Sequence, residues 1–403
     1  MKKQTAIAFL GALVPDTPEY RSIALRRSGN MVQDGLVCGL KARGAEVEIF
    51  SAQPRPSYPR DRKLFYRGRK IDYRGMKMHL VPFFNILVIK TICIILCETG
   101  AIIAWALRNR GKQRILLVYN TFTPPLAIVW LLGKITRSRS AALLYDQGMP
   151  PRELHLSPLK RFIYRLVEIN AKFFIPRIDR RIVINEAVGR DYGGGKDFLV
   201  VDGGISHNIL DRLFELETPP QTENRPMTFL LAGLISPING TRLLGEALTI
   251  ARDPRIRVVV AGNGHDLPYI EELCAREPER VSYAGSLNLD ELFELYARTD
   301  VLLNLRVLSE ADKYLFPSKF LEYLAVGKPT VTTPAGHIER EYGAYCFVMK
   351  DCTAQTLAQT FDQLLETPTG ELSDRGRKAR KFMVENRTWE SRSAEILDYL
   401  IRP

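Results

Sequence analysis

The chain has 403 residues, which is too long for one ordinary hydrophobic core and predicts two domains of roughly 200 residues each. Its apolar share of 46% and charged share of 25% are those of a soluble globular protein. The six cysteines form no Cys-x-x-Cys pair and His is scarce, so neither a structural zinc site nor a disulfide framework is expected. Residues 1–200 hold 34 basic and 15 acidic residues, whereas the remainder holds 23 and 30, so the two halves differ in the sign of their charge.

The first half alternates predicted strands with helix-length segments. A strand over residues 5–10 is followed by a long loop and by a helix over 30–42 that Gly44 ends. The apolar stretch in the first of these strands is too short for a secretory signal, so we expect a cytoplasmic location. Further strands are predicted at 47–50, 115–119, 141–145 and 181–184. This alternation indicates parallel βαβ units.

Residues 60–77 and 80–107 form an unusual pair of segments. The first is a basic run interleaved with aromatic residues, which suits an anionic lipid surface and would also suit nucleic acid. The second is strongly apolar but is interrupted by Lys90 and Glu98, among others. We expect it to be a buried helix of the first domain, with a helix at the bilayer surface or a spanning helix as the alternatives.

A second alternation begins after a Pro-rich linker, LETPPQTENRP, at residues 216–226. Its buried strands are predicted at 228–232, 257–261, 281–284, 301–305 and 330–333, and a last helix is predicted from about 388 to 401. The expected fold class is therefore α/β, with two Rossmann-like domains facing across a cleft. We place the first domain at 1–215, the second at 216–386, and the closing helix at 387–403.

The most informative segment is KYLFPSKFLEYLAVGKPTVTT, residues 313–333. Ser318 is expected to be the N-cap of a short helix, and Gly327 to end that helix in a left-handed turn. The amino end of such a helix favours a phosphate group, and Lys319 adds a full positive charge there. Glu322, one turn into the helix, is placed to accept hydrogen bonds from the hydroxyls of a ribose.

Five stretches of the second half, in order, resemble family 4 glycosyltransferases, which have the GT-B fold. The string PSKFLEYLAVGKP is similar to the donor-binding segment of that family, and RTWESRSAEIL at 387–397 to its closing helix, which crosses back onto the first domain. The other three are FLLAGLISPINGTRLLGEAL, VVVAGNGHDLPYIEEL and RVSYAGSLNLDELFELYARTDVLLNL. The first half matches more weakly, best over 27–50 and 200–205.

The resemblance implies a retaining transfer of a sugar from a nucleotide-diphosphate sugar, with no cofactor and without an essential metal. It places Gly233 in a glycine-rich loop, and Gly285 and Ser286 in the loop that holds the nucleotide base. The positive charge that neutralises the departing pyrophosphate would come from Lys319, Arg306 and the Ser318 helix end, with Arg242 a weaker candidate. No Asp-x-Asp pair occurs in the sequence to hold a metal–diphosphate complex.

Two departures from the family pattern concern the contacts to the donor, one to its pyrophosphate and one to its sugar. Leu234 and Asn239 stand where the family commonly has an Arg and a Lys. Tyr314 stands where it often has the first of two glutamates, of which Glu322 matches the second, so Glu310 or Asp312 is expected to substitute.

Candidate residues of the first domain lie at the ends of predicted strands, where ligands collect in open α/β sheets. Asp146 is the candidate that orients or deprotonates the acceptor hydroxyl, although it could equally cap a helix. The other acceptor-side candidates are Gly29, Asn30, Asn120 and Thr121. His265 could touch the donor, but a lone histidine in a loop more often faces solvent and binds no ligand.

The basic first domain predicts an anionic partner. We expect it to dock on the cytoplasmic face of a membrane and to receive a lipid-linked or glycan acceptor, with an anionic soluble acceptor as the competing explanation. Three other functions are alternatives: a sugar-nucleotide epimerase of the same fold, a nucleic-acid-binding protein, and a catalytically inactive relative. Scarce histidine argues against the first, and the absence of a recognised nucleic-acid motif against the second.

Overall fold

The computed structural model describes residues 4–21, 27–121, 126–145, 158–216, 225–307 and 313–403, which form two compact units. The amino-terminal unit comprises residues 1–204 and 389–403, and the carboxyl-terminal unit comprises 205–388. Residues 205–215, which we placed in the first domain, therefore group with the second. The closing helix belongs to the amino-terminal unit, as the resemblance implied.

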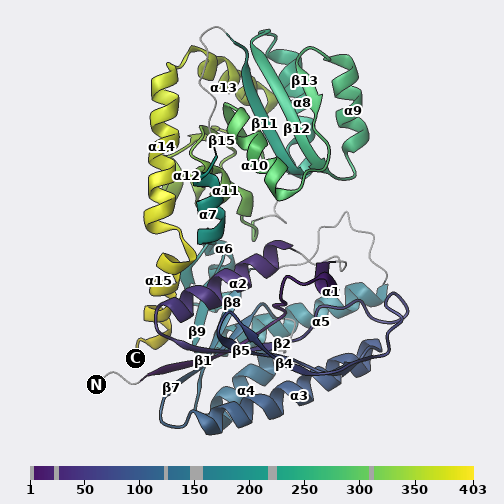
Figure 1. The fold of residues 1–403 in the computed structure, drawn as a ribbon, viewed down its shortest axis with the longest axis vertical. Coiled ribbons are helices and arrows are strands. Elements are labelled where there is room, and N and C mark those ends of the chain that lie inside the picture. Colours follow the sequence, from purple (N-terminus) through teal and green to yellow (C-terminus); the bar gives the residue numbers. More distant parts are fainter. Residues whose placement is uncertain (1–3, 22–26, 122–125, 146–157, 217–224, 308–312) are drawn as a thin grey trace. The chain divides into compact units, whose positions relative to one another are not determined.

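The amino-terminal unit is built on an eight-stranded sheet in the order β10-β9-β8-β7-β1-β2-β5-β4, parallel except for β4 (Figure 1). Its strands are β1 (Thr5–Gly11), β2 (Glu46–Ser51), β4 (Arg69–Tyr73), β5 (Met76–Leu80), β7 (Gln113–Tyr119), β8 (Arg139–Leu144), β9 (Arg180–Val183) and β10 (Leu199–Val200). A separate antiparallel pair is formed by β3 (Phe65–Tyr66) and β6 (Phe83–Phe84). The predicted strands are all present, and the basic run 60–77 forms β3, β4 and the start of β5.

The helices of this unit lie on both faces of the sheet. They are α1 (Pro18–Arg21), α2 (Arg27–Ala42), α3 (Leu87–Arg108), α4 (Leu126–Thr136), α5 (Pro158–Phe174), the short 3₁₀ helix η1 (Ile175–Arg177), α6 (Glu186–Gly193) and α15 (Trp389–Ile401). On one side of β1 the sheet continues through β7, β8 and β9, and α4 and α5 connect these strands. On the other side of β1 lies β2, and α2 connects β1 to it. Right-handed crossovers therefore place α3, α4 and α5 on the face opposite α2.

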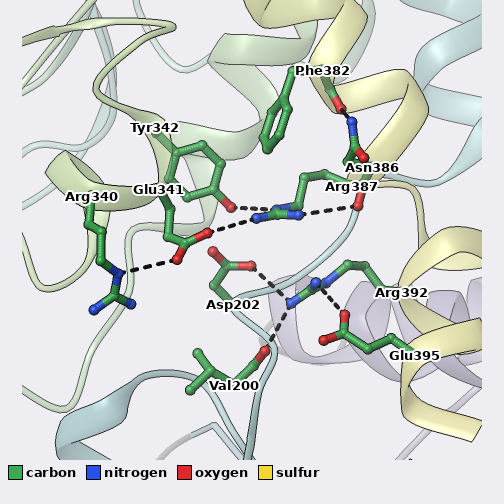
Figure 2. Close-up of polar contacts among 10 residues, drawn as sticks. All are labelled: Val200, Asp202, Arg340, Glu341, Tyr342, Phe382, Asn386, Arg387, Arg392 and Glu395. Carbon is green, nitrogen blue, oxygen red and sulfur yellow. Dashed lines mark hydrogen bonds and ion pairs between the residues drawn. The ribbon is translucent and has the colours of Figure 1, made fainter. Parts of the chain in front are cut away.

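Helix α15 packs against α2 because two glycines of α2 leave room for it. A Cβ atom on Gly35 would lie 2.1 Å from the ring of Trp389, and one on Gly39 would lie 2.3 Å from the hydroxyl of Ser393. Arg392 fastens the same helix to the end of β10, since it donates a 3.0 Å hydrogen bond to the carbonyl of Val200 (Figure 2). The sequence that resembled a closing helix thus acts as one.

The expectation that residues 80–107 form a buried helix was only partly right. They contain α3, whose inner side is buried at Ile94, Glu98, Ile102, Trp105 and Ala106. The helix is long and apolar enough to cross a membrane by length and composition, yet only 17% of its apolar window is buried inside the protein. One sheet face can cover only one side of a helix, so the apolar outer side of α3 is left exposed.

The carboxyl-terminal unit is built on a six-stranded parallel sheet in the order β13-β12-β11-β14-β15-β16. Its strands are β11 (Met227–Leu234), β12 (Ile256–Asn263), β13 (Val281–Tyr283), β14 (Val301–Asn304), β15 (Thr330–Thr332) and β16 (Phe347–Val348). Its helices are α7 (His207–Phe214), η2 (Pro237–Asn239), α8 (Thr241–Ile250), α9 (Leu267–Arg276), α10 (Leu289–Arg298), α11 (Ser318–Val326), α12 (Ile338–Tyr342), α13 (Ala354–Glu366) and α14 (Thr369–Asn386).

The aliphatic strands of this unit bury one core together with α8 and α13, as the five predicted apolar runs required. At the end of α14, Arg387 holds α12 in place. Its Nε donates a 3.0 Å hydrogen bond to the hydroxyl of Tyr342, and its guanidinium lies 4.8 Å from the ring centre of Phe382 and 3.3 Å from a carboxylate oxygen of Glu341 (Figure 2). This contact orders the chain immediately before it passes into α15.

Candidate functional site

At the carboxyl ends of β11 and β12, the backbone of one strand lies directly against the backbone of the other, with glycine at the contact. Gly233 has φ 136° and Gly262 has φ 130°, conformations that residues with a side chain rarely adopt. A Cβ atom on Gly262 would lie only 1.8 Å from the carbonyl oxygen of Gly233. The amide of Gly262 also donates a 2.8 Å hydrogen bond to the carbonyl of Gly285, so three successive strand ends are joined at glycines. Because glycine has no side chain, these residues leave space at this end of the sheet.

A cavity of about 280 Å³ lies at this end of the sheet. The loop after β11, the end of β14 and the amino end of α11 contribute to its wall. The polar and glycine residues that line it are Gly233, Asn239, Thr241, Asn304, Arg306, Ser318, Lys319 and Tyr323. The structure thus brings together four of the predicted donor-binding residues, which are Gly233, Arg306, Ser318 and Lys319.

Helix α11 starts one residue away from the predicted position. Pro317 is the N-cap residue and makes no side-chain capping bond, so Ser318 is the first helical residue rather than the cap. Proline fixes the backbone in a conformation compatible with a helix start. The hydroxyl of Ser318 is therefore not used to cap the helix. Gly327, with φ 80°, ends the helix in the left-handed conformation as predicted.

Lys319 lies directly over the glycine loop. Its Nζ is 3.0 Å from the position that a Cβ atom on Gly233 would occupy. Burial lowers the pKa of this ammonium group, and the nearby carboxylate of Glu322 opposes that shift. A cation held against a glycine backbone at a helix amino end forms a site for an anionic group.

Arg306 supplies the second cation of the cavity wall. Its Nη1 lies 3.4 Å from Oδ1 of Asn239, and its backbone amide donates a 3.0 Å hydrogen bond to the hydroxyl of Thr333. Asn239 also donates a 2.8 Å hydrogen bond to the carbonyl of Leu234. Asn239, which stands where the family commonly has a Lys, therefore holds the loop after β11 and contacts Arg306, which follows β14.

Glu322 is held by a residue that sequence reasoning missed. The hydroxyl of Tyr296, in α10, donates a 2.7 Å hydrogen bond to Oε1 of Glu322. Burial raises the pKa of Glu322, and the hydrogen bond from Tyr296 and the charge of Lys319 both oppose that rise. The next residue, Tyr323, donates a 3.1 Å hydrogen bond to the carbonyl of Ala232, which fastens α11 to β11. Nothing in the sequence spacing of Tyr296 and Glu322 indicates their contact.

Other donor-side candidates lie away from the cavity wall. Ser286 is exposed beside Gly285, and His265 is an exposed residue of the loop after β12. Arg242 is turned toward Asp266, to which its Nε donates a 3.0 Å hydrogen bond, and its guanidinium stacks on the ring of Tyr269. An arginine paired in this way is less suited to neutralise a diphosphate. Glu310 and Asp312 lie outside the described residues.

The acceptor-side candidates gather at the carboxyl ends of β1, β7 and β8. A Cβ atom on Gly29 would lie 3.5 Å from the hydroxyl of Tyr119. Asn120 has φ 59° and accepts a 2.8 Å hydrogen bond from the amide of Tyr145, while Thr121 beside it is buried.

Asn30 accepts a 3.0 Å hydrogen bond from the amide of Val14 and donates a 3.1 Å bond to its carbonyl. The amides of Asn30 and Asn120 thus hold loops of this unit, and their role toward an acceptor stays a prediction. Asp146 lies outside the described residues.

Comparison with known proteins bears on this arrangement. The family described as "Glycosyl transferases group 1" matches residues 226–367, which contain the cavity and its wall. No curated protein matches the sequence.

Solved structures match over nearly the whole chain. Alr3699/HepE from Anabaena, in a complex with UDP, has 16% identity and a TM-score of 0.64 and covers 99% of both chains. A glycosyltransferase from Rickettsia africae has 16% identity and a TM-score of 0.63 and covers 99% of this chain and 98% of its own. Sucrose-phosphate synthase from Thermosynechococcus elongatus has 14% identity, a TM-score of 0.63 and 98% coverage of both. At these identities the matches show the fold.

Residues 226–367 thus match the group 1 glycosyltransferases, and the whole chain has the two-domain GT-B fold of the solved glycosyltransferases.

Proposed function

We propose that the protein transfers a sugar, with retention of its anomeric configuration, from a nucleoside-diphosphate sugar to a lipid-linked or polysaccharide-precursor acceptor at the cytoplasmic face of a membrane. The observation that carries the donor part is the cavity wall that Lys319, Arg306 and the amino end of α11 share. Two cations and a helix amino end within one cavity suit a diphosphate.

In this proposal the bond between the anomeric carbon and the β-phosphate oxygen breaks, and negative charge develops on the departing diphosphate. Lys319 and the free amides at the start of α11 stabilise that charge. The acceptor hydroxyl attacks from the side of the leaving group, and its proton passes to the departing phosphate oxygen or to a base. Glu322, held by Tyr296, accepts hydrogen bonds from the ribose and fixes the donor in position.

The related structures indicate which nucleotide base to test first in the donor. Alr3699/HepE was solved with UDP and with UDP-glucose, so uridine donors are the first to test on this chain. Thermal-shift measurements with a panel of nucleoside diphosphates and nucleotide sugars identify the donor, because a ligand that binds only the folded protein raises its melting temperature. No shift with any of them would contradict the donor site.

The acceptor part rests on charge. The basic excess of residues 1–200 supports an anionic surface or acceptor. Within the run 60–77, Arg69 is paired with Glu19 at 2.7 Å, whereas Arg67 and Lys70 are exposed. Transfer of labelled sugar from the identified donor into a lipid extract, compared with transfer to soluble phosphorylated sugars, tests the acceptor class. Product formed only with soluble acceptors would overturn this part and leave the transferase intact.

A further inference from the structure

Three neighbouring helices of the amino-terminal unit expose apolar side chains on one surface. Helix α4 packs against both α3 and α5. We give the name apolar helix face to the following set of exposed apolar residues from the three helices. It comprises Val88, Ile92, Leu96, Ile103 and Leu107 of α3, Leu131 and Ile135 of α4, and Phe162, Leu166, Ile169 and Phe173 of α5. Exposed apolar residues gathered in this number mark an interaction site rather than ordinary surface.

Helix α5 shows the pattern most clearly. Phe162, Leu166, Ile169 and Phe173 recur at intervals of four, three and four residues, which places them along one side of the helix. They are 58, 50, 64 and 51% exposed, so this apolar side faces outward, whereas Ala171 faces inward and is buried. A helix that covers the core of a soluble protein turns its apolar side inward. Helix α5 has, in addition, an apolar side that faces outward.

Helix α3 extends the same surface without an exposed charge between Leu87 and Leu107. Lys90 is half-buried, and its ammonium group donates a hydrogen bond to the carbonyl of Arg55. The inner side of α3 is part of the unit, since Ile94 packs with Tyr66 and Phe83. We therefore treat α3 as lying along a surface and not as crossing a membrane.

Basic residues outnumber acidic residues on the three helices of the apolar helix face. The three helices contain seven Lys or Arg residues and only two Glu residues. Of the two glutamates, Glu98 is buried, and Glu168 accepts a 2.8 Å hydrogen bond from the hydroxyl of Tyr192 and forms a 3.3 Å ion pair with Lys172. Arg161 and Arg165 flank the outward side of α5 and have no acidic partner among the described residues.

These observations indicate which kind of partner covers the apolar helix face. A second copy of the chain, related by a twofold axis, would bring the same cations against each other, which opposes pairing. An anionic bilayer offers acyl chains to the apolar side chains and phosphates to the flanking arginines.

We propose that the apolar helix face docks this protein on the surface of an anionic phospholipid bilayer, with α5 lying in the interface plane. This proposal rests on the membrane location proposed above and adds the surface that produces it. It also shifts the main contact from the run 60–77, which we had expected from the sequence, to α3, α4 and α5.

The test uses the full chain and flotation with vesicles of phosphatidylcholine alone or with 30% phosphatidylglycerol. Binding should require the anionic lipid and fall when salt is raised. Ile169→Asp should weaken binding at least tenfold, whereas Ile250→Asp, on an exposed residue of α8, should leave it unchanged. Arg161→Gln with Arg165→Gln should weaken binding roughly fivefold per charge, and the control pair is Arg298→Gln with Arg377→Gln.

Two readouts separate this proposal from the donor proposal. Each variant should keep the wild-type melting temperature and the wild-type affinity for the nucleoside diphosphate found in the panel. If vesicles bind and no nucleoside diphosphate does, only the donor proposal fails. Wild-type vesicle binding by Ile169→Asp, or no binding to anionic vesicles at low salt, overturns the docking surface. The docking surface is also overturned if the wild type does not bind vesicles and Ile169→Asp changes the protein from a dimer to a monomer. That result would assign the apolar helix face to a second copy of the chain.

Discussion

The hydroxyl of Tyr296 and Oε1 of Glu322 lie 2.7 Å apart, and this hydrogen bond joins α10 to α11, whose amino end lines the cavity. Tyr296 is fully buried, so the bond is made away from bulk water, where a hydrogen bond to a carboxylate is strong. It supports the ionised form of Glu322 against the effect of burial, which raises the pKa of that carboxyl. If Glu322 contacts the donor as proposed, Tyr296 is a positioning residue for that contact.

Replacing Tyr296 with Phe should weaken donor binding by about 1 kcal/mol, because one hydrogen bond to a carboxylate is lost. The pKa of Glu322 should rise further, so donor affinity should begin to fall at a higher pH as the solution is acidified. Calorimetric titration with the donor between pH 5 and 8 measures both effects. Glu322→Ala should lose about 1–3 kcal/mol and the acidic decline together. An unchanged pH profile in Tyr296→Phe would show that the bond is only structural.

Lys319→Met should weaken nucleoside-diphosphate binding by roughly 2 kcal/mol, because a charge-assisted contact is removed. In the wild type, burial lowers the pKa of Lys319, so affinity should decline as pH rises through that lowered pKa and the charge is lost. Lys319→Arg keeps its charge at every accessible pH and should lack the decline. Titration calorimetry from pH 7 to 10 makes the comparison. Wild-type affinity in Lys319→Met would remove this residue from the donor site.

Gly262→Ala should destabilise the protein by roughly 1–3 kcal/mol and abolish donor binding, because its Cβ atom would collide with the backbone of Gly233. Gly285→Ala is the matched control. It also has a positive φ, of 82°, but a Cβ atom there meets nothing within 4 Å, so only backbone strain of about 1 kcal/mol is expected. Urea unfolding of both variants checks the difference. Equal destabilisation would mean that the contact between the two loops is unimportant.

Glu98 should make the stability of the protein fall with rising pH. Its carboxyl is buried in α3, neither oxygen has a hydrogen-bond partner among the described residues, and burial raises its pKa to about 8. Between its ordinary pKa and that value the unfolded chain is ionised while the folded protein holds a proton. The free energy of unfolding should therefore drop by about 1.4 kcal/mol per pH unit across this window and level off above pH 8.

Glu98→Gln should remove this pH dependence and be more stable than the wild type at pH 8.5. Urea unfolding at pH 5.5, 7 and 8.5 gives the profile, and Glu294→Gln, which removes an exposed carboxylate from α10, is the control. Equal slopes in Glu98→Gln and the wild type would contradict the assignment.

Transfer should proceed without a divalent metal. The cavity wall supplies positive charge through Lys319 and Arg306, and the sequence contains no Asp-x-Asp pair. Activity measured after treatment with a chelator should match the untreated rate. Activity that is lost with the chelator and restored by magnesium or manganese would contradict this expectation.

The sequence by itself determined the alternation of strands and helices and the position of helix α11. Strand positions in both halves could be predicted because apolar runs, glycines and prolines act on their own neighbours in the chain. The end of α11 at Gly327 follows from the same local chemistry. Local patterns also carry the resemblance, since α11 and the residues that flank it form one continuous segment.

Only the tertiary structure decided which distant residues meet and which side of a helix is covered. The contact between Tyr296 and Glu322, and that between Lys319 and Gly233, depend on how separate βα units pack, which spacing along the chain does not encode. An apolar run such as α3 likewise looks the same whether it is buried or exposed. Its outer side stays uncovered because the sheet contacts the helix from one direction alone, and that geometry exists only in the folded unit.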